Sequence, residues 1–135
     1  MNNQEKIIML EKYIKAGSSP ILLENFNTEN LKNAVILNSD CDNSLLNGHY
    51  EDINFVAPEW YNQILEKSKN TYSLLVIKDL NKIDKEEQLK FLELFKYKKV
   101  STFELPKNCV IVVTCTNLEE NSISEEIYTL LAHIC

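Results

Sequence analysis

Hydrophobic residues along the chain form two kinds of pattern. One kind is a short, continuous aliphatic run, and such runs are typical of strands that are buried on both faces of a sheet. They occupy residues 21–23, 34–37, 74–77 and 109–113. Because these runs alternate with amphipathic segments, the pattern predicts an α/β fold, a three-layer α/β/α sandwich with a mainly parallel sheet.

The amphipathic segments between these runs predict helices. Each has apolar residues at helical spacing, and several begin at a capping residue or a proline. The first of them ends at Gly17, because glycine suits the position after a helix and Pro20 cannot continue it. The expected helices cover residues 7–14, residues 29–33 after a Thr28 cap, a segment from Pro58, residues 85–95 after an Asp84 cap, and a segment from Ser122 through Ile134.

Two segments fit neither pattern. Residues 38–52 are rich in Asn, Asp and Ser and are the least regular part of the chain, while residues 100–105 form an extended or hairpin-like piece that ends at Pro106. Loops on a rigid scaffold often carry recognition, so both segments are candidate docking loops. With no internal repeat and 135 residues, we expect one domain over residues 1–135.

Charge and hydropathy narrow the class of protein. The net charge is −6, which argues against a broad phosphate-binding surface, so we do not expect nucleic-acid binding to be the function. The N-terminus is polar, and no apolar run approaches the ~20 residues of a membrane span, so we expect a cytoplasmic protein. The densest basic stretch, Lys96 to Lys99, fits a solvated helix end, with a docking patch as the alternative.

Cysteine spacing gives no sign of a metal site or a disulfide framework. The chain has four cysteines, Cys41, Cys109, Cys115 and Cys135, with no CxxC pairing, and we expect all four to be reduced thiols. Cys41 and His49 are eight residues apart and would supply only half of a metal site. We therefore expect no metal and no cofactor.

Several segments together resemble the core of AAA+ ATPases. Residues 73–95 resemble the Walker B strand and its following helix, and residues 110–117 resemble the strand that ends in the sensor 1 asparagine, here Asn117. Residues 16–23 resemble the lead into a Walker A loop, and residues 58–61 resemble a helix of the MoxR-like branch. The resemblance implies a P-loop NTPase fold over residues 5–135, without the helical lid of the family.

The phosphate-binding loop of that family is missing. Residues 24–32 contain no glycine, although a phosphate cradle needs glycines for its left-handed turns and close backbone approach. Phe26 would obstruct such an approach, and Glu24 would place negative charge near a polyphosphate. Lys32 stands where the family has Ser or Thr, so we assign it no phosphate role.

The other catalytic positions are altered as well. Lys78 stands where the resemblance implies the aspartate that supports Mg²⁺, and Asp79 stands in place of the catalytic glutamate. We expect Asp79 to pair with Lys78 or Lys82, or to cap a turn, and Asn117 to be a strand-end turn residue. By loose alignment His133 falls at the arginine-finger position, where we expect a helix-end residue.

These departures lead to three hypotheses about function. The first is a non-catalytic protein-interaction or scaffold module that does not hydrolyse ATP and whose partner is an AAA+ ATPase or a second copy of the chain. The second is a weak nucleotide-binding protein or ATPase with an unconventional site of Lys32, Asp79 and Asn117. The third is a clamp-loader-type DNA-associated factor, which the acidic charge disfavours.

Overall fold

The computed structural model of the protein describes residues 2–17, 19–120 and 122–134. The helices are α1 (Asn3–Lys15), α2 (Asn43–Asn47), α3 (Glu59–Lys67), α4 (Lys85–Gln88), α5 (Leu92–Tyr97) and α6 (Glu125–Tyr128), with 3₁₀ turns η1 (Thr28–Asn30), η2 (Leu80–Lys82) and η3 (Leu89–Phe91). The strands are β1 (Ile21–Glu24), β2 (Ala34–Asn38), β3 (His49–Glu51), β4 (Asn54–Val56), β5 (Ser73–Lys78), β6 (Lys99–Val100), β7 (Phe103–Glu104), β8 (Cys109–Cys115) and β9 (Ala132–Ile134). Among the helices of the described ranges, none is both long and apolar enough to cross a membrane.

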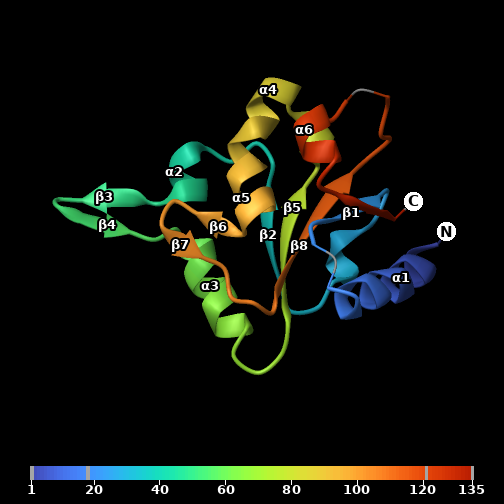
Figure 1. Ribbon diagram of the computed structural model, residues 1–135, viewed down its shortest axis with the longest axis horizontal. Coiled ribbons are helices and arrows are strands. Elements are labelled where there is room, and N and C mark those ends of the chain that lie inside the picture. Colours follow the sequence, from blue (N-terminus) through green and yellow to red (C-terminus); the bar gives the residue numbers. More distant parts are fainter. Residues whose placement is uncertain (1, 18, 121, 135) are drawn as a thin grey trace.

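Five strands form the central sheet, in the order β2-β5-β8-β1-β9, and every pairing in it is parallel (Figure 1). The central strands β5 and β8 are the aliphatic runs expected from the sequence, and Val76 lies opposite Val112 in their register. Both strands are buried on both faces, which explains why their sequences are continuously apolar. The expected mainly parallel α/β architecture is confirmed.

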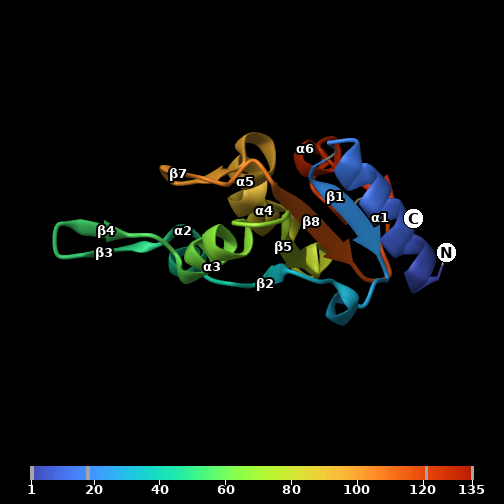
Figure 2. The same ribbon diagram turned by 90° about the horizontal axis from the view of Figure 1, so that it is seen from below.

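The two faces of the sheet pack against different parts of the chain. One face carries the larger core, in which Trp60 and Ile64 of α3 and Phe91 and Phe95 near α5 are buried against the sheet. The opposite face packs against Leu10 of α1 and against the loop that follows β1 (Figure 2). The faces alternate residue by residue along each strand, as the pleat of a sheet requires.

The connection from β1 to β2 contains no α-helix and has only the single 3₁₀ turn η1. The expected helix over 29–33 is therefore absent, and Asn27 rather than Thr28 caps the turn, since its Oδ1 accepts a 3.0 Å hydrogen bond from the N–H of Glu29. Phe26 in this connection is buried in the core of the α1 face. A loop thus covers a part of the sheet where a helix was expected.

The C-terminal segment differs from the sequence prediction. Instead of a helix through Ile134, α6 ends at Tyr128 and β9 follows as an edge strand. Ile134 pairs with Leu23 of β1, and the N–H of Ala132 donates to the carbonyl of Pro20 at 2.9 Å. Spacing alone did not separate the two structures, because a short apolar run fits either a helix or a buried strand.

Residues 38–52, which the sequence indicated as irregular, contain α2 and the first strand of a two-stranded hairpin. We call this hairpin, His49–Val56, the arm; it pairs β3 with β4 and projects from one end of the molecule, away from α1 (Figure 1). Residues 100–105 contain β7 and close a second, shorter hairpin with β6, as expected. The expected helix over 85–95 is divided into α4, η3 and α5.

Candidate functional site

Five parallel strands end at one edge of the sheet, and this carboxyl edge is the candidate site. Open parallel sheets bind ligands outside the carboxyl ends of their strands, at the point where the strand order reverses. In this sheet the chain leaves β1 toward β2 on one side, and β8 toward β9 on the other, so the reversal lies between β1 and β8. A ligand at this point would meet the residues that follow β1, β5 and β8.

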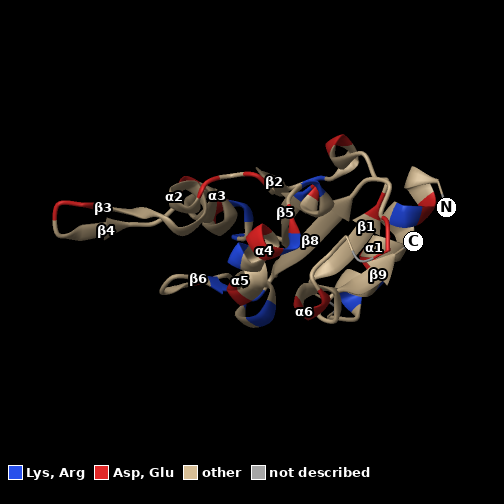
Figure 3. Cartoon of the chain, turned by 90° about the horizontal axis from the view of Figure 1, so that it is seen from above, with Lys and Arg blue, Asp and Glu red and all other residues tan. Residues whose placement is uncertain are grey.

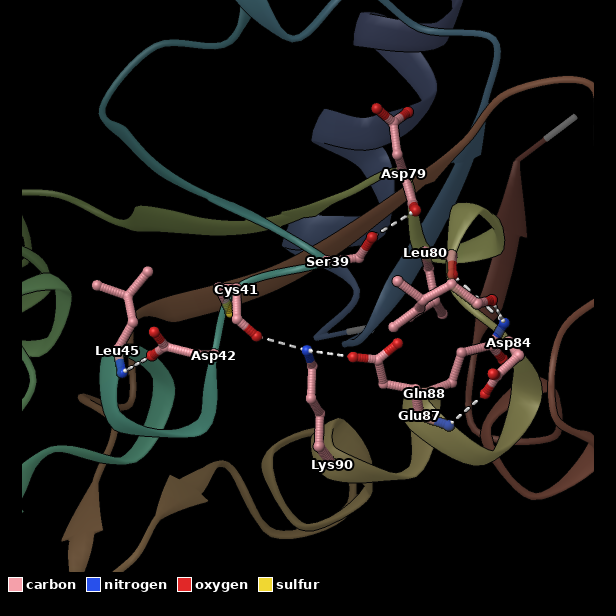
Figure 4. Close-up of polar contacts among 11 residues, drawn as sticks. Ser39, Cys41, Asp42, Leu45, Asp79, Leu80, Asp84, Glu87, Gln88 and Lys90 are labelled. Carbon is pink, nitrogen blue, oxygen red and sulfur yellow. Dashed lines mark hydrogen bonds and ion pairs between the residues drawn. The ribbon is translucent and has the colours of Figure 1, made fainter.

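Asp79, directly after β5, makes hydrogen bonds through its backbone, including the one to Ser39 in Figure 4, and contacts through its carboxylate. Its backbone is left-handed, with φ 61°, and its carbonyl accepts a 2.6 Å hydrogen bond from the hydroxyl of Ser39. One carboxylate oxygen lies 3.1 Å from Nζ of Lys82, and the other accepts a 3.3 Å bond from Oγ1 of Thr116. The expected pairing of Asp79 with Lys82 is confirmed, and the carboxylate is engaged within the protein.

The loop after β1 is filled by the protein's own groups. Nζ of Lys6, a buried residue of α1, donates to the backbone carbonyls of Glu24 and Asn25. The N–H of Asn25 donates to the carbonyl of Cys115 at 2.8 Å, so it is not directed at solvent. A phosphate cradle requires several N–H groups that converge on the anion. Here an ammonium group converges on carbonyl oxygens instead.

Asn117 lies at the end of β8 and is joined to the loop after β1. Its backbone N–H donates a 2.8 Å hydrogen bond to Oδ1 of Asn25, and its φ is 51°. Next to it, the amide of Asn81 makes two hydrogen bonds with the backbone of Thr116, at 2.9 and 3.3 Å. Asn117 therefore acts as a strand-end turn residue.

The structure does not bring Lys32, Asp79 and Asn117 into one site. Lys32 precedes the first residue of β2, whose partner in the register is Leu74 near the start of β5. It therefore lies at the amino edge of the sheet, while Asp79 and Asn117 lie at the carboxyl edge. The five residues of β2 separate these edges by about 15 Å, at ~3.3 Å per residue.

A cavity of about 610 Å³ lies beside the end of β1, and most of its charged lining residues are acidic. Glu24, Glu119, Glu120 and Glu125 contribute four carboxylates to its lining, against one lysine and His133. A polyphosphate would meet like charge here, and such repulsion reaches about 4 kcal/mol for a pair at 4 Å and an effective dielectric near 20. This cavity does not suit a nucleotide triphosphate.

His133 lies on β9 and not at a helix end, which corrects the expectation from the sequence. Its Nε2 is 3.3 Å from Oε2 of Glu24, and its Nδ1 is 3.5 Å from the hydroxyl of Tyr128. The register places His133 opposite Leu22 in the neighbouring strand. The side chain thus packs at the rim of the acidic cavity, where it interacts with the protein's own carboxylate.

A second cavity, of about 450 Å³, lies beside the end of β2 and surrounds Lys90. Nζ of Lys90 donates to the carbonyl of Cys41 at 2.6 Å and lies 3.7 Å from Oε1 of Glu87 (Figure 4). The lysine side chain is only 12% exposed, and its charge is balanced by nearby carboxylates that include Asp40 and Asp42. Lys90 therefore holds the loop between β2 and α2 in place.

The described cysteines are free and buried. Burial raises the pKa of Cys41, Cys109 and Cys115, and that of Cys115 rises to about 12. Cys135 lies outside the described residues. Cys41 is buried while His49 pairs with Glu51 on the arm, and within the described ranges no three His, Cys, Asp or Glu side chains gather as a metal site.

Two features of the molecule were not expected from the sequence. Gln88 is fully buried, and its amide bonds the carbonyls of Leu80, Ile83 and Ser122 and the N–H of Ser124.

The arm exposes Tyr50 and Ile53, which are 72% and 92% accessible. The short alternation around Asp52 could have indicated the hairpin, because Asp adopts left-handed turn angles.

Comparison with known proteins adds no evidence about the function of this site. No protein-family model matches the sequence, and no curated protein matches it. The observations that bear on function are therefore the closed carboxyl edge and the exposed arm.

Proposed function

We propose that this protein is a non-catalytic protein-interaction or scaffold module on an AAA+-like core, and that it does not hydrolyse ATP. The observation that carries the proposal is the closure of the loop after β1 by Lys6. The groups that would have to hold a triphosphate are already bonded within the protein. A ligand would have to break these contacts before it could bind.

The arrangement of the strands supports the AAA+-like core. Counted along the chain, the five parallel strands stand in the order 2-3-4-1-5, with the first strand between the fourth and the fifth. The resemblance to P-loop NTPases implies this same arrangement, in which the Walker A, Walker B and sensor 1 positions meet at one edge. Helices against both faces also support a three-layer sandwich.

The charges at this edge support the loss of catalysis. Phosphoryl transfer depends almost entirely on positioned charge and on bound metal. Lys78 replaces the carboxylate that would support Mg²⁺, and Asp79 is already paired with Lys82. The acidic cavity beside Glu24 adds repulsion toward a phosphate.

The arm supports an interaction function. Large apolar side chains are seldom left exposed without a partner when they cluster, and Tyr50 and Ile53 are both at the projecting end. The arm also packs against the second hairpin, because Phe55 stacks on Phe103 of β7 with ring centroids 5.6 Å apart. A preorganised hairpin loses little conformational freedom when it docks.

Thermal unfolding with and without nucleotide tests the loss of the phosphate site. If the phosphate site is lost as proposed, Mg-ATP, Mg-ADP and Mg-GTP at millimolar concentration should leave the melting temperature unchanged. A ligand at about 100 times its dissociation constant would add ~2.7 kcal/mol to the stability. Stabilisation that is lost in Asp79→Asn or Asn117→Ala would overturn the proposal in favour of the weak nucleotide-binding hypothesis.

Site-specific photo-crosslinking in cells tests the arm. A photoreactive phenylalanine analogue at Tyr50 should give a crosslinked protein adduct, while the same analogue at Tyr72 should give none. Tyr72 is a matched control, because it is 40% exposed but lies before β5, outside the arm. Equal adduct yields at the two positions would contradict an interaction role for the arm.

A further inference from the structure

The arm has an acidic and apolar end. Glu51 and Asp52 stand at its turn, next to the exposed side chains of Tyr50 and Ile53 (Figure 3). Apart from the bond between His49 and Glu51 at 3.3 Å, no ion pair among the described residues involves the arm. The carboxylate of Asp52 has no cation of its own chain within ion-pair distance in that set.

A basic and aromatic surface lies near the middle of the molecule's long axis, where α5 meets β6 (Figure 1). It consists of Lys96, Tyr97, Lys98 and Lys99, at the end of α5 and the start of β6, and we call it the basic patch. Tyr97 is 60% exposed, and its ring lies 5.4 Å from Nζ of Lys96 and 5.9 Å from Nζ of Lys99. The patch thus offers two ammonium groups beside an accessible aromatic ring, with a third, that of Lys98, next to them in the sequence.

The arm and the basic patch are held in a fixed relation. Phe55 of the arm stacks on Phe103, and β7, which carries Phe103, pairs with β6 in the second hairpin. Val100 of β6 is buried in the core, so this hairpin is anchored to the rest of the protein. Among the described residues, no ion pair joins the arm to the basic patch of the same chain. Both complementary surfaces are therefore available to another molecule.

We propose that the partner of the arm is a second copy of this chain, with the arm of each copy on the basic patch of the other. This inference rests on the proposed function and names its partner. Two surfaces of one chain that are complementary to each other allow reciprocal docking about a two-fold axis. A single eight-residue arm would bury less than the ~800 Å² per partner that stable interfaces bury. Two reciprocal contacts double the buried area.

Sedimentation velocity of the purified full chain tests the proposal. The protein should form a dimer whose dissociation constant rises at least tenfold between low and high salt, because exposed charges are screened at high ionic strength. Two variants should weaken the dimer at least tenfold: E51K/D52N, which reverses the arm, and K96E/K99E, which reverses the patch. Asn replaces Asp52 because it tolerates the left-handed φ of 55° at this position.

Mixing the two variants provides the decisive measurement. Each variant alone places like charges at both contacts, whereas a mixed pair restores opposite charges at both. The mixture should therefore form a one-to-one heterodimer and nothing larger. The control is K12E/K15E, which reverses exposed charges on α1 at the far end and should dimerise as the unaltered chain does.

A wild-type chain that stays monomeric at about 0.5 mM and low salt would overturn the proposal, since even weak transient contacts associate at such concentrations. Failure of the mixed variants to associate would overturn it as well, and so would an unlimited alternating polymer. None of these outcomes restores a nucleotide site, so the proposed function would then stand with a different partner. Far-ultraviolet circular dichroism and thermal melts of each variant show that it is folded.

Discussion

The side chain of Asn25 accepts a 2.8 Å hydrogen bond from the backbone N–H of Asn117, and this bond joins the ends of β1 and β8. Both asparagines have left-handed backbones, with φ of 50° and 51°. Asn tolerates this region better than most residues, which allows two tight turns without glycine. The point of the sheet at which a ligand would enter is therefore closed by two asparagine turns.

Replacement of Lys6 by Met should destabilise the protein by about 1–3 kcal/mol, the cost of leaving buried polar groups without partners. Met preserves most of the apolar stem, so the loss reports the bonds to the carbonyls of Glu24 and Asn25. Urea-induced unfolding gives the free energy. Lys12→Met on the same helix is the control, because Lys12 is exposed and should change stability by a few tenths of a kcal/mol. Equal effects of the two substitutions would contradict a bonded role for Lys6.

The central strands were predictable because burial on both faces leaves an unbroken apolar sequence. Val110 to Val113 shows this clearly, since each residue faces one of the two cores. Ile134 was not predictable, because its three-residue strand is defined by pairing with Leu23, and the same spacing fits a helical turn. Pairing partners far apart in the sequence decide such short edge strands.

Two substitutions of Asp79 should separate its backbone from its side chain. Asp79→Ala removes the contacts to Lys82 and Thr116 and keeps a Cβ in a left-handed backbone, so it should cost about 1–2 kcal/mol. Asp79→Gly removes the same contacts but adopts φ 61° freely, so it should cost less. Chemical unfolding of both variants measures the difference. A glycine variant less stable than the alanine variant would show that backbone strain is unimportant here.

The closure of the candidate site was only partly predictable. The absence of glycine from residues 24–32 indicated the loss of a phosphate cradle, and the structure shows what occupies that position. The role of Lys6 could not be read from the sequence, because its ammonium acts on residues 18 and 19 positions away. Its place in an amphipathic helix favours exposure, and only the packing of α1 on β1 buries it.

Stability should fall with pH above about 9 because of Cys115, whose pKa burial raises from 9.0 to about 12. Below pH 9 the thiol is protonated in both states and contributes fully. Between the two pKa values the unfolded chain loses its proton while the folded chain keeps it, so the free energy of unfolding decreases as pH rises. The difference between the wild type and Cys115→Ala, measured from pH ~8 to ~10, isolates this contribution. Parallel curves for the two proteins would contradict it.

Gln88→Ala should destabilise the protein by about 1–3 kcal/mol or more, because several buried backbone groups lose their partner at once. The amide joins η2 to the segment before α6 through Ile83, Ser122 and Ser124. Hydrogen exchange should therefore accelerate at Ser124, whose N–H donates to Oε1. Gln63→Ala on the exposed surface of α3 is the control and should leave both readouts nearly unchanged.

The two glycines of the chain should respond very differently to replacement by alanine. Gly17 and Gly48 both have positive φ, 79° and 85°, so each substitution carries backbone strain of about 1–3 kcal/mol, and the ψ of −173° at Gly48 lies in a region that is essentially restricted to glycine. At Gly17 a Cβ meets nothing within 4 Å, whereas at Gly48 it would lie 2.4 Å from the carbonyl oxygen of Val56. That oxygen belongs to β4, so Gly48→Ala can be accommodated only by moving the base of the arm. Unfolding measurements should show the larger loss for Gly48→Ala, and the crosslink yield at Tyr50 should fall with it but not with Gly17→Ala. A Gly48→Ala variant as stable as Gly17→Ala, with an undiminished crosslink, would mean that the arm does not depend on its close approach to Gly48.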